Sequence, residues 1–216
     1  MTTNNGSKKT MRSNMSGEAR KNQLIKATIK CIAKKGLSST TMVDVTSEAG
    51  LSLGIVNLHF KSKEKLLNET LRYVSDEYRN GSNAIFSDDS KTVAEKVMAH
   101  VDYDFCKKNI SRNKLAVWFA FWGEAKSRPI YRDICAKHDL FLSDNLTQLF
   151  THLKSLGDYK QVNPEIVNMG YTALIDGLWL DLLITPNLLS VETARAVALN
   201  YLMVQFPKHF QINGVI

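Results

Sequence analysis

The segment from Thr41 to Lys63 constrains the fold more than any other part of the sequence. It is TMVDVTSEAG LSLGIVNLHF KSK, in which two short runs with helical spacing of apolar residues flank Gly50. Thr41 and Asp44 have the spacing of a capping box, and Gly50 stands where the end of a helix needs a residue that tolerates positive φ. Ser52 can cap the second helix. The pattern predicts a helix-turn-helix, and a helical hairpin inside a larger core is the alternative.

The two predicted helices each have a face that can be assigned. Val56 and Phe60 are four residues apart in the second helix, so we expect them to share a buried face. The apolar residues at helical spacing in the first helix are Val43, Val45 and Ala49. The residues left on the outer face of the second helix are Leu53, Gly54, Asn57 and Leu58.

Positive charge is concentrated around this segment. Residues 1–80 hold fourteen Lys and Arg and seven Asp and Glu, whereas residues 81–216 hold fourteen of each, so the net charge of +7 belongs to the N-terminal part. Basic side chains release counterions when they bind phosphates, and this distribution therefore favours a nucleic-acid partner. Residues 1–17 are rich in Thr, Asn, Ser and Gly and predict a disordered basic tail, which either contacts DNA or serves only solubility.

The rest of the chain predicts an all-α protein of about nine helices, without a strand of useful length or an internal repeat. Beyond the helix-turn-helix, helices are predicted over residues 18–35, 63–80, 90–108, 112–126, 130–155, 164–185 and 191–207, with a break over 81–90. The expected domains are the tail over 1–17, a three-helix DNA-binding domain over 18–64 and a larger helical domain over 65–216.

Several classes of protein are disfavoured. No apolar run approaches the roughly 20 residues of a membrane span, and the N-terminus lacks a signal-peptide core, so we expect a cytoplasmic protein. The three cysteines are widely spaced, which argues against a disulfide framework or a metal site. The five histidines are scattered, and no nucleophile–base motif or glycine-rich phosphate loop occurs, so we expect neither an enzyme nor a cofactor. A nonspecific nucleoid or RNA-binding protein would explain the basic N-terminal part but not the neutral helical remainder.

Residues 23–67 resemble the N-terminal domain of the TetR family of transcriptional regulators. The matching residues are Gly36, Thr40, Thr41, Asp44, Ala49, Gly50, Ser52, Gly54, Phe60, Ser62, Lys63, Glu64, Leu66 and Leu67. Residues 116–122, 130–132 and 173–180 resemble one subgroup, the BetI-type repressors, which govern the synthesis of glycine betaine from choline. The likeness covers nearly the whole chain except the first 17 residues and the last several.

The resemblance implies a homodimer that binds a palindromic double-stranded DNA operator and releases it when an effector binds. Residues 164–184 and 191–206 would then form the dimer interface. Together with the outward residues of the second helix, the expected DNA contacts are Thr40, Thr41, Ser52, Leu53, Gly54, Asn57, Leu58, His59 and Lys63. Asn57 and Leu58 depart from the family pattern. Asn can pair with adenine and Leu can pack on a thymine methyl, so the operator sequence is expected to differ from that of better-known relatives.

Aromatic residues of the C-terminal part suggest the effector site. Trp118 and Trp122 are four residues apart, and Asp176 lies in an apolar stretch one helical turn from Trp179. Aromatic faces with a carboxylate suit a quaternary ammonium ion, which cannot donate a hydrogen bond. The predicted ligand-binding residues are Tyr103, Trp118, Trp122, Tyr171, Asp176 and Trp179. The alternative is that these rings are core residues and that Asp176 is structural.

Two functions remain open at this point. In the first, a repressor responds to choline or another organic cation and regulates genes of the choline-to-glycine-betaine conversion. In the second, a repressor of the same fold senses multiple drugs or cationic compounds and controls an efflux transporter. Preferential binding of bulky dyes over choline would favour the second.

Overall fold

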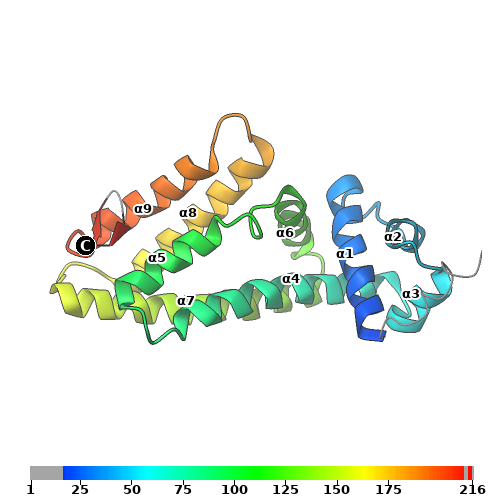
Figure 1. Cartoon of the computed structure of the whole chain (residues 1–216), viewed down its shortest axis with the longest axis horizontal. Coiled ribbons are helices and arrows are strands. Elements are labelled where there is room, and N and C mark those ends of the chain that lie inside the picture. Colours follow the sequence, from blue (N-terminus) through cyan, green and yellow to red (C-terminus); the bar gives the residue numbers. More distant parts are fainter. Residues whose placement is uncertain (1–16, 212–213, 216) are drawn as a thin grey trace, which may run out of the picture. The chain divides into compact units, whose positions relative to one another are not determined.

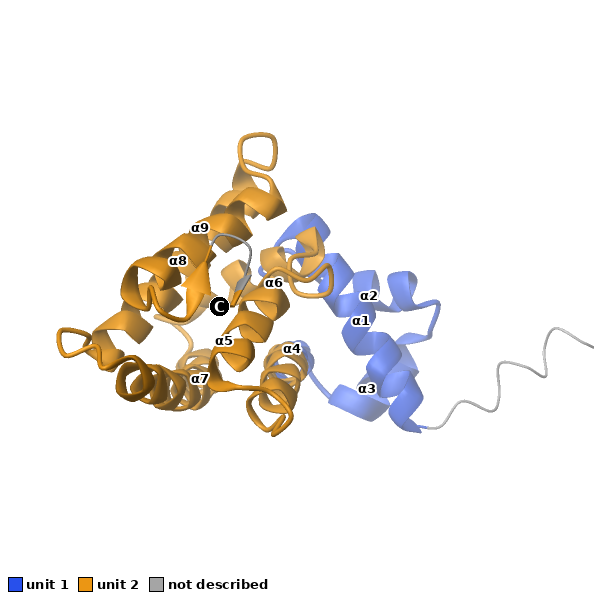
Figure 2. Cartoon of the chain, turned by 60° about the vertical axis from the view of Figure 1, so that its left-hand side comes forward, with its two compact units in different colours: residues 1–70 blue, residues 71–216 orange. Residues whose placement is uncertain are grey.

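The computed structural model describes residues 17–211 and 214–215 of the 216-residue chain. All but the last residue of the predicted basic tail lies outside the described residues. The chain divides between Thr70 and Leu71 into two compact units, here called the N-terminal and C-terminal units (Figure 2). This division lies within helix α4 (Lys63–Phe86), a few residues after the domain boundary expected at 64/65.

The N-terminal unit contains α1 (Gly17–Lys35), α2 (Met42–Ala49), α3 (Leu53–Phe60) and the start of α4. The capping box of Thr41 and Asp44 is present, and Gly50 ends α2 with φ of +64°, as predicted. The side chains of Leu24, Ile32, Val45, Val56 and Phe60 form its core. The helix-turn-helix predicted from the sequence is thus confirmed in its boundaries and in the buried face of α3.

The C-terminal unit contains the rest of α4 and five further helices (Figure 1). These are α5 (Val93–Asp104), α6 (Arg112–Glu124), α7 (Pro129–Gly157), α8 (Pro164–Ile184) and α9 (Val191–Gln205). Helix α8 packs against both α7 and α9. The all-α fold with nine helices among the described residues agrees with the prediction. The one addition is a short antiparallel hairpin of β1 (Phe210–Gln211) and β2 (Gly214–Val215).

Two local predictions were wrong. Residues 81–86 continue α4 and do not break it. Gly81 allows the close approach of Tyr103 from α5, since a Cβ there would overlap the hydroxyl of Tyr103. Ser52 occupies the N-cap position of α3, but its side chain makes no capping hydrogen bond. Among the apolar residues of α2, Val45 is buried and Val43 is exposed.

Helix α8 also differs from expectation. Its length and mean hydropathy of 1.2 would suit a membrane span, although no such stretch was expected, and 33% of the apolar stretch is buried within the chain. One side of α8 packs on its neighbours, while the other exposes Ile166, Met169 and Ile184. Asp176 and Asp181 interrupt its apolar sequence. This exposed side is a surface that lacks a partner within the described residues.

Candidate functional site

The outer surface of α3 gathers most of the predicted DNA contacts. Ser52, Leu53, Gly54, Asn57 and Leu58 are all exposed, and Leu58 is 75% exposed. A short helix that exposes two leucines beside an amide has a surface suited to reading base edges and thymine methyl groups in a major groove.

Thr40 and Lys63 have internal partners. Thr40 is 1% exposed, and its hydroxyl donates to the carbonyl of Gly36 at 2.7 Å. Its side chain is therefore withdrawn from the surface and holds the turn after α1. The ammonium of Lys63 donates to the carbonyl of Ser38 at 2.8 Å, so this residue joins the start of α4 to the same turn.

Thr41 and His59 lie at the edges of this surface. Thr41 is exposed, but its hydroxyl accepts a hydrogen bond from the amide of Asp44 at 3.1 Å and donates to the carboxylate at 2.8 Å. Lys35 and Thr41 lower the pKa of Asp44 to about 2, which keeps the cap ionised. His59 is half-buried and lies near Gly17. Thr40 and Thr41 thus both stabilise the helix-turn-helix.

Much of the positive charge on α1 is matched within the N-terminal unit. Lys30 and Lys34 both pair with Glu48, at 3.1 and 3.0 Å. Lys21 pairs with Glu69 at 3.1 Å. By contrast, Lys61 and Lys65, which follow α3, are exposed and form no ion pair with the described residues. Two unmatched positive charges therefore lie directly after the outer surface of α3, and exposed Lys26 on α1 is a further one.

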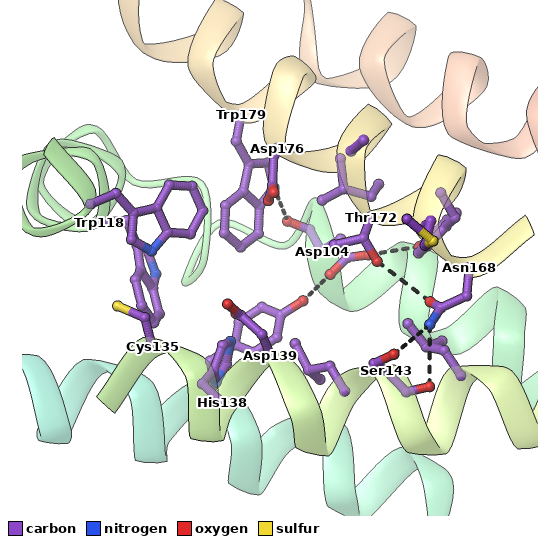
Figure 3. A pocket seen from close by; sticks show the side chains of 18 of the residues that line it. Asp104, Trp118, Cys135, His138, Asp139, Ser143, Asn168, Thr172, Asp176 and Trp179 are labelled. Carbon is purple, nitrogen blue, oxygen red and sulfur yellow. Dashed lines mark hydrogen bonds between the residues drawn. The ribbon is translucent and has the colours of Figure 1, made fainter. Parts of the chain in front are cut away.

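In the C-terminal unit a cavity of about 620 Å³ lies between α7 and α8 and reaches residues of α4, α5 and α6 (Figure 3). It brings together five of the six predicted ligand-binding residues, namely Trp118, Trp122, Tyr171, Asp176 and Trp179. The chain has three tryptophans in all, and each of them lines this cavity.

Tyr103 does not line the cavity. Its hydroxyl donates to the carbonyls of Glu77 and Tyr78, at 3.3 and 3.2 Å, and lies over Gly81, so the ring fastens α5 to α4. Tyr78, which was not predicted, lines the cavity in its place. The ring of Tyr78 meets that of Trp179 edge to face, with centroids 5.7 Å apart.

Asp104 is the main site residue that the sequence analysis missed. It is buried at the end of α5, and its carboxylate accepts hydrogen bonds from the hydroxyls of Tyr78 and Tyr171. Its backbone carbonyl accepts from the indole of Trp179 at 3.1 Å. Burial raises the pKa of both tyrosines well above the usual value, so their hydroxyls remain donors at neutral pH. The available signal was the spacing of Val97, His100, Val101 and Asp104, which places Asp104 on the apolar face of α5.

Two further carboxylates and two histidines, His100 and His138, line the same cavity. Burial, and next the negative charges of Asp139 and Asp104, raise the pKa of Asp176 to about 6. Burial also raises the pKa of Asp139, although this residue is exposed at the surface. Burial lowers the pKa of His138 to about 4, so this ring is neutral at pH 7. The cavity therefore combines aromatic rings with an excess of acidic groups.

Comparison with known families identifies the chain. Residues 24–70 match the bacterial regulatory proteins of the tetR family, and residues 93–207 match the C-terminal domain of BetI-type transcriptional repressors. The chain belongs to the BetI-type branch of the TetR family. A regulator from Vibrio campbellii named BetI is 32% identical, with 86% of this chain and 91% of that protein covered. BetI 1 of Chromohalobacter salexigens is 27% identical, with 88% and 91% covered.

Solved structures share the TetR fold. A putative regulator from Pseudomonas aeruginosa has a TM-score of 0.77 at 22% identity, over 88% of this chain and 91% of that one. A putative regulator from Saccharomonospora viridis, solved in complex with choline, has a TM-score of 0.74 at 22% identity, over 87% and 96%. SmeT, the repressor of a multidrug efflux pump of Stenotrophomonas maltophilia, has a TM-score of 0.70 at 17% identity, over 87% and 90%. At these identities the likeness concerns the fold alone.

The protein is therefore a TetR-family transcriptional repressor, and its relatives are regulators of transcription, not enzymes. The tetR-family match covers the helix-turn-helix of α2 and α3, and the BetI-type match covers α5 to α9. The cavity lies almost entirely within the second match.

Proposed function

We propose that this TetR-family repressor binds a palindromic operator as a homodimer and releases it when choline or a similar organic cation occupies the cavity. The observation that carries the proposal is the cavity itself, in which all three tryptophans face three carboxylates. We expect the protein to act in the cytoplasm, where its operator lies, and to regulate genes of the choline-to-glycine-betaine conversion.

The cavity has the chemistry of a receptor for an organic cation. A cation near the face of an aromatic ring gains about 0.5–2 kcal/mol when the site is desolvated. Trp118 and Trp122 lie with ring centroids 5.8 Å apart on α6, and Trp179 lies on α8. The negative charge of Asp104 and Asp176 adds attraction over a longer range. A quaternary ammonium group fits such rings because it has no hydrogen bond to lose.

The names of the relatives support choline as the type of cation. The regulators from Vibrio and Chromohalobacter carry the name BetI, and the Saccharomonospora structure contains choline. These observations give choline first place in the test.

The exposed apolar side of α8 supports a homodimer. Ile166, Met169 and Ile184 of α8 and Val197 and Val204 of α9 are exposed on two helices that pack together. Apolar patches of this kind mark interaction surfaces in soluble proteins. A second copy would cover them and would supply a second α3 for the other half of a palindromic operator, whose half-sites lie about 34–36 Å apart.

Helix α4 offers a connection between the two functions. Tyr78 lines the cavity, and the same helix begins at Lys63 in the N-terminal unit. A ligand that shifts Tyr78 or Asp104 therefore acts on the helix that leads to the DNA-binding surface. A coupling of about 1–3 kcal/mol between effector and operator binding is typical of such regulators.

The cavity can be tested apart from the operator. Choline should raise the melting temperature of the purified protein and change its tryptophan fluorescence, because a ligand that binds the native state stabilises it. Asp176→Asn should weaken both effects. Asp181→Asn is the matched control, since Asp181 is an exposed aspartate of the same helix outside the cavity lining. No effect of choline on the native protein would contradict the proposed effector.

A second candidate is a repressor of an efflux transporter that senses multiple cationic compounds. The cavity volume favours it, because about 620 Å³ lies in the range of roughly 300–1,000 Å³ that encloses drug-sized ligands. The shared fold with SmeT is compatible with this candidate. Tighter binding of bulky cationic dyes than of choline in the same fluorescence titration would favour it.

A further inference from the structure

The charges that line the cavity do not balance. The acidic residues are Asp104, Asp139 and Asp176, whereas Arg132 is the only lysine or arginine in the lining. His138 is neutral at pH 7 and supplies no compensating charge, and the second histidine of the lining, His100, lies with its Nδ1 3.4 Å from the carboxylate of Asp104. When the three aspartates are counted against Arg132 alone, a ligand with a single positive charge, such as choline, leaves one carboxylate without a cation.

The carboxylates come from three helices that surround the cavity, α5, α7 and α8 (Figure 3). Asp104 has two tyrosine hydroxyls and the ring of His100 as partners, whereas Asp139 and Asp176 have no hydrogen bond or ion pair with any described residue. Asp139 and Asp176 lie on α7 and α8, which pack against each other. Two carboxylates are thus available to a ligand in addition to Asp104.

His138 provides an independent indication of a ligand. Its side chain is 7% exposed and lines the cavity, and its Nδ1 has no hydrogen-bond partner among the described residues. Its ring is held between Tyr78 and Trp118, with centroid distances of 5.3 and 5.2 Å. Buried polar atoms nearly always have a partner, so this nitrogen indicates a polar occupant or a bound water.

We propose that the preferred effector is an elongated organic dication of the protonated diamine class, with its two charged ends held at separate carboxylates of the cavity. One end lies among the rings beside Asp104, and the other lies between Asp139 and Asp176. The ammonium hydrogens of a diamine also provide a donor for His138. This inference rests on the proposed function, since it specifies the cation that the same cavity prefers.

The dimensions of the cavity agree with this class of ligand. Choline is small compared with a cavity of about 620 Å³, whereas a longer chain with a charge at each end would fill more of this volume. Its methylene groups would contact the apolar lining, which includes Leu142, Leu146 and Ile175.

The test compares ligands that differ only in the second charge. Full-length protein is titrated with 1,6-diaminohexane, n-hexylamine and choline at a mildly alkaline pH, and binding is followed by tryptophan fluorescence and calorimetry. We expect the diamine to bind about tenfold or more tightly than the monoamine. In Asp139→Asn and Asp176→Asn this advantage should shrink to about threefold or less, whereas Asp181→Asn should retain it.

The outcomes separate this inference from the proposed function. Equal affinities for diamine and monoamine in the native protein overturn the inference, and choline binding in the same series leaves the proposed function standing. An advantage of the diamine that persists in both Asn variants also overturns it. Failure of every cation to bind overturns both. Melting curves of the variants without ligand show that each is folded.

Discussion

The hydroxyl of Tyr171 donates a hydrogen bond of 2.7 Å to a carboxylate oxygen of Asp104, whose side chain is only 1% exposed. Tyr78 donates to the other oxygen, so α4, α5 and α8 meet at one buried negative charge beside the cavity. This cluster is both a structural junction and part of the proposed effector site, because both tyrosines also line the cavity.

The first prediction concerns the stability of this junction. Tyr171→Phe should lower the free energy of unfolding by about 1.5–3 kcal/mol, because a hydrogen bond to a buried charge is lost. Tyr201→Phe is the control, since its hydroxyl donates to the neutral carbonyl of Val167 at 3.0 Å and should be worth about 1 kcal/mol. Urea unfolding of both variants measures the difference. Equal losses would show that Asp104 adds nothing to the bond.

The second prediction concerns pH. The pKa of Asp176 is about 6 in the folded chain and about 3.9 in an unfolded one, so the folded state binds this proton more tightly. This contribution to stability is present below about pH 4 and is lost as the pH rises through 6. The asparagine of Asp176→Asn does not titrate, so the variant does not lose this stability as the pH rises. The unfolding free energy of the variant minus that of the native protein should therefore increase by about 1–3 kcal/mol between pH 4 and 7. A difference that stays constant with pH would contradict the raised pKa.

The same titration should govern effector binding. A cation favours the ionised form of Asp176, so its affinity should increase as the pH rises through about 6. In Asp176→Asn this increase should be reduced. Fluorescence titrations of both proteins at several pH values measure it, and identical pH profiles would show that the ligand does not sense Asp176.

The fold was largely predictable from local signals. The capping residues Thr41 and Asp44 and the glycine at position 50 specify the ends of α2 without reference to the rest of the chain. The extent of α4 was not predictable in this way, because Gly81 is explained by the approach of Tyr103 from α5, a tertiary contact.

The effector site was predicted in its aromatic residues but not in its charges. Tryptophans at helical spacing can be recognised from the sequence, and all three line the cavity. Asp104 and Asp139 were missed because an acidic residue on a helix is usually solvated, and only the packing of α5, α7 and α8 brings these two together with Asp176. Tyr103 was predicted as a ligand contact, but its hydroxyl is held by backbone carbonyls of α4.

The third prediction concerns Lys61. This residue ends α3 with φ of +58°, a conformation that costs a residue with a Cβ about 1–2 kcal/mol. Lys61→Gly should therefore stabilise the protein by about 0.5–1 kcal/mol. Lys65→Gly is the control, because Lys65 lies in α4, where glycine should destabilise by a similar amount. Destabilisation by both substitutions in urea unfolding would contradict the assigned strain.

The fourth prediction concerns base reading by α3. Asn57→Ala should weaken binding to the operator by about 1–3 kcal/mol, because the lost contact is to a base edge, while binding to unrelated DNA should hardly change. Lys65→Ala should weaken binding to both kinds of DNA and reduce the salt dependence, as expected for a phosphate contact. Anisotropy titrations at several salt concentrations compare them. Equal weakening of operator and unrelated DNA by Asn57→Ala would remove its reading role.

The most direct test of the account is release of operator DNA by an effector. The protein is bound to a labelled fragment from the promoter region of its own gene, and choline or 1,6-diaminohexane is added while anisotropy is recorded. We predict specific binding that either cation reverses, and a weaker response in Asp176→Asn than in Asp181→Asn. A complex that forms but persists at millimolar concentrations of both cations, or a protein that binds no promoter fragment at low ionic strength, would contradict the account.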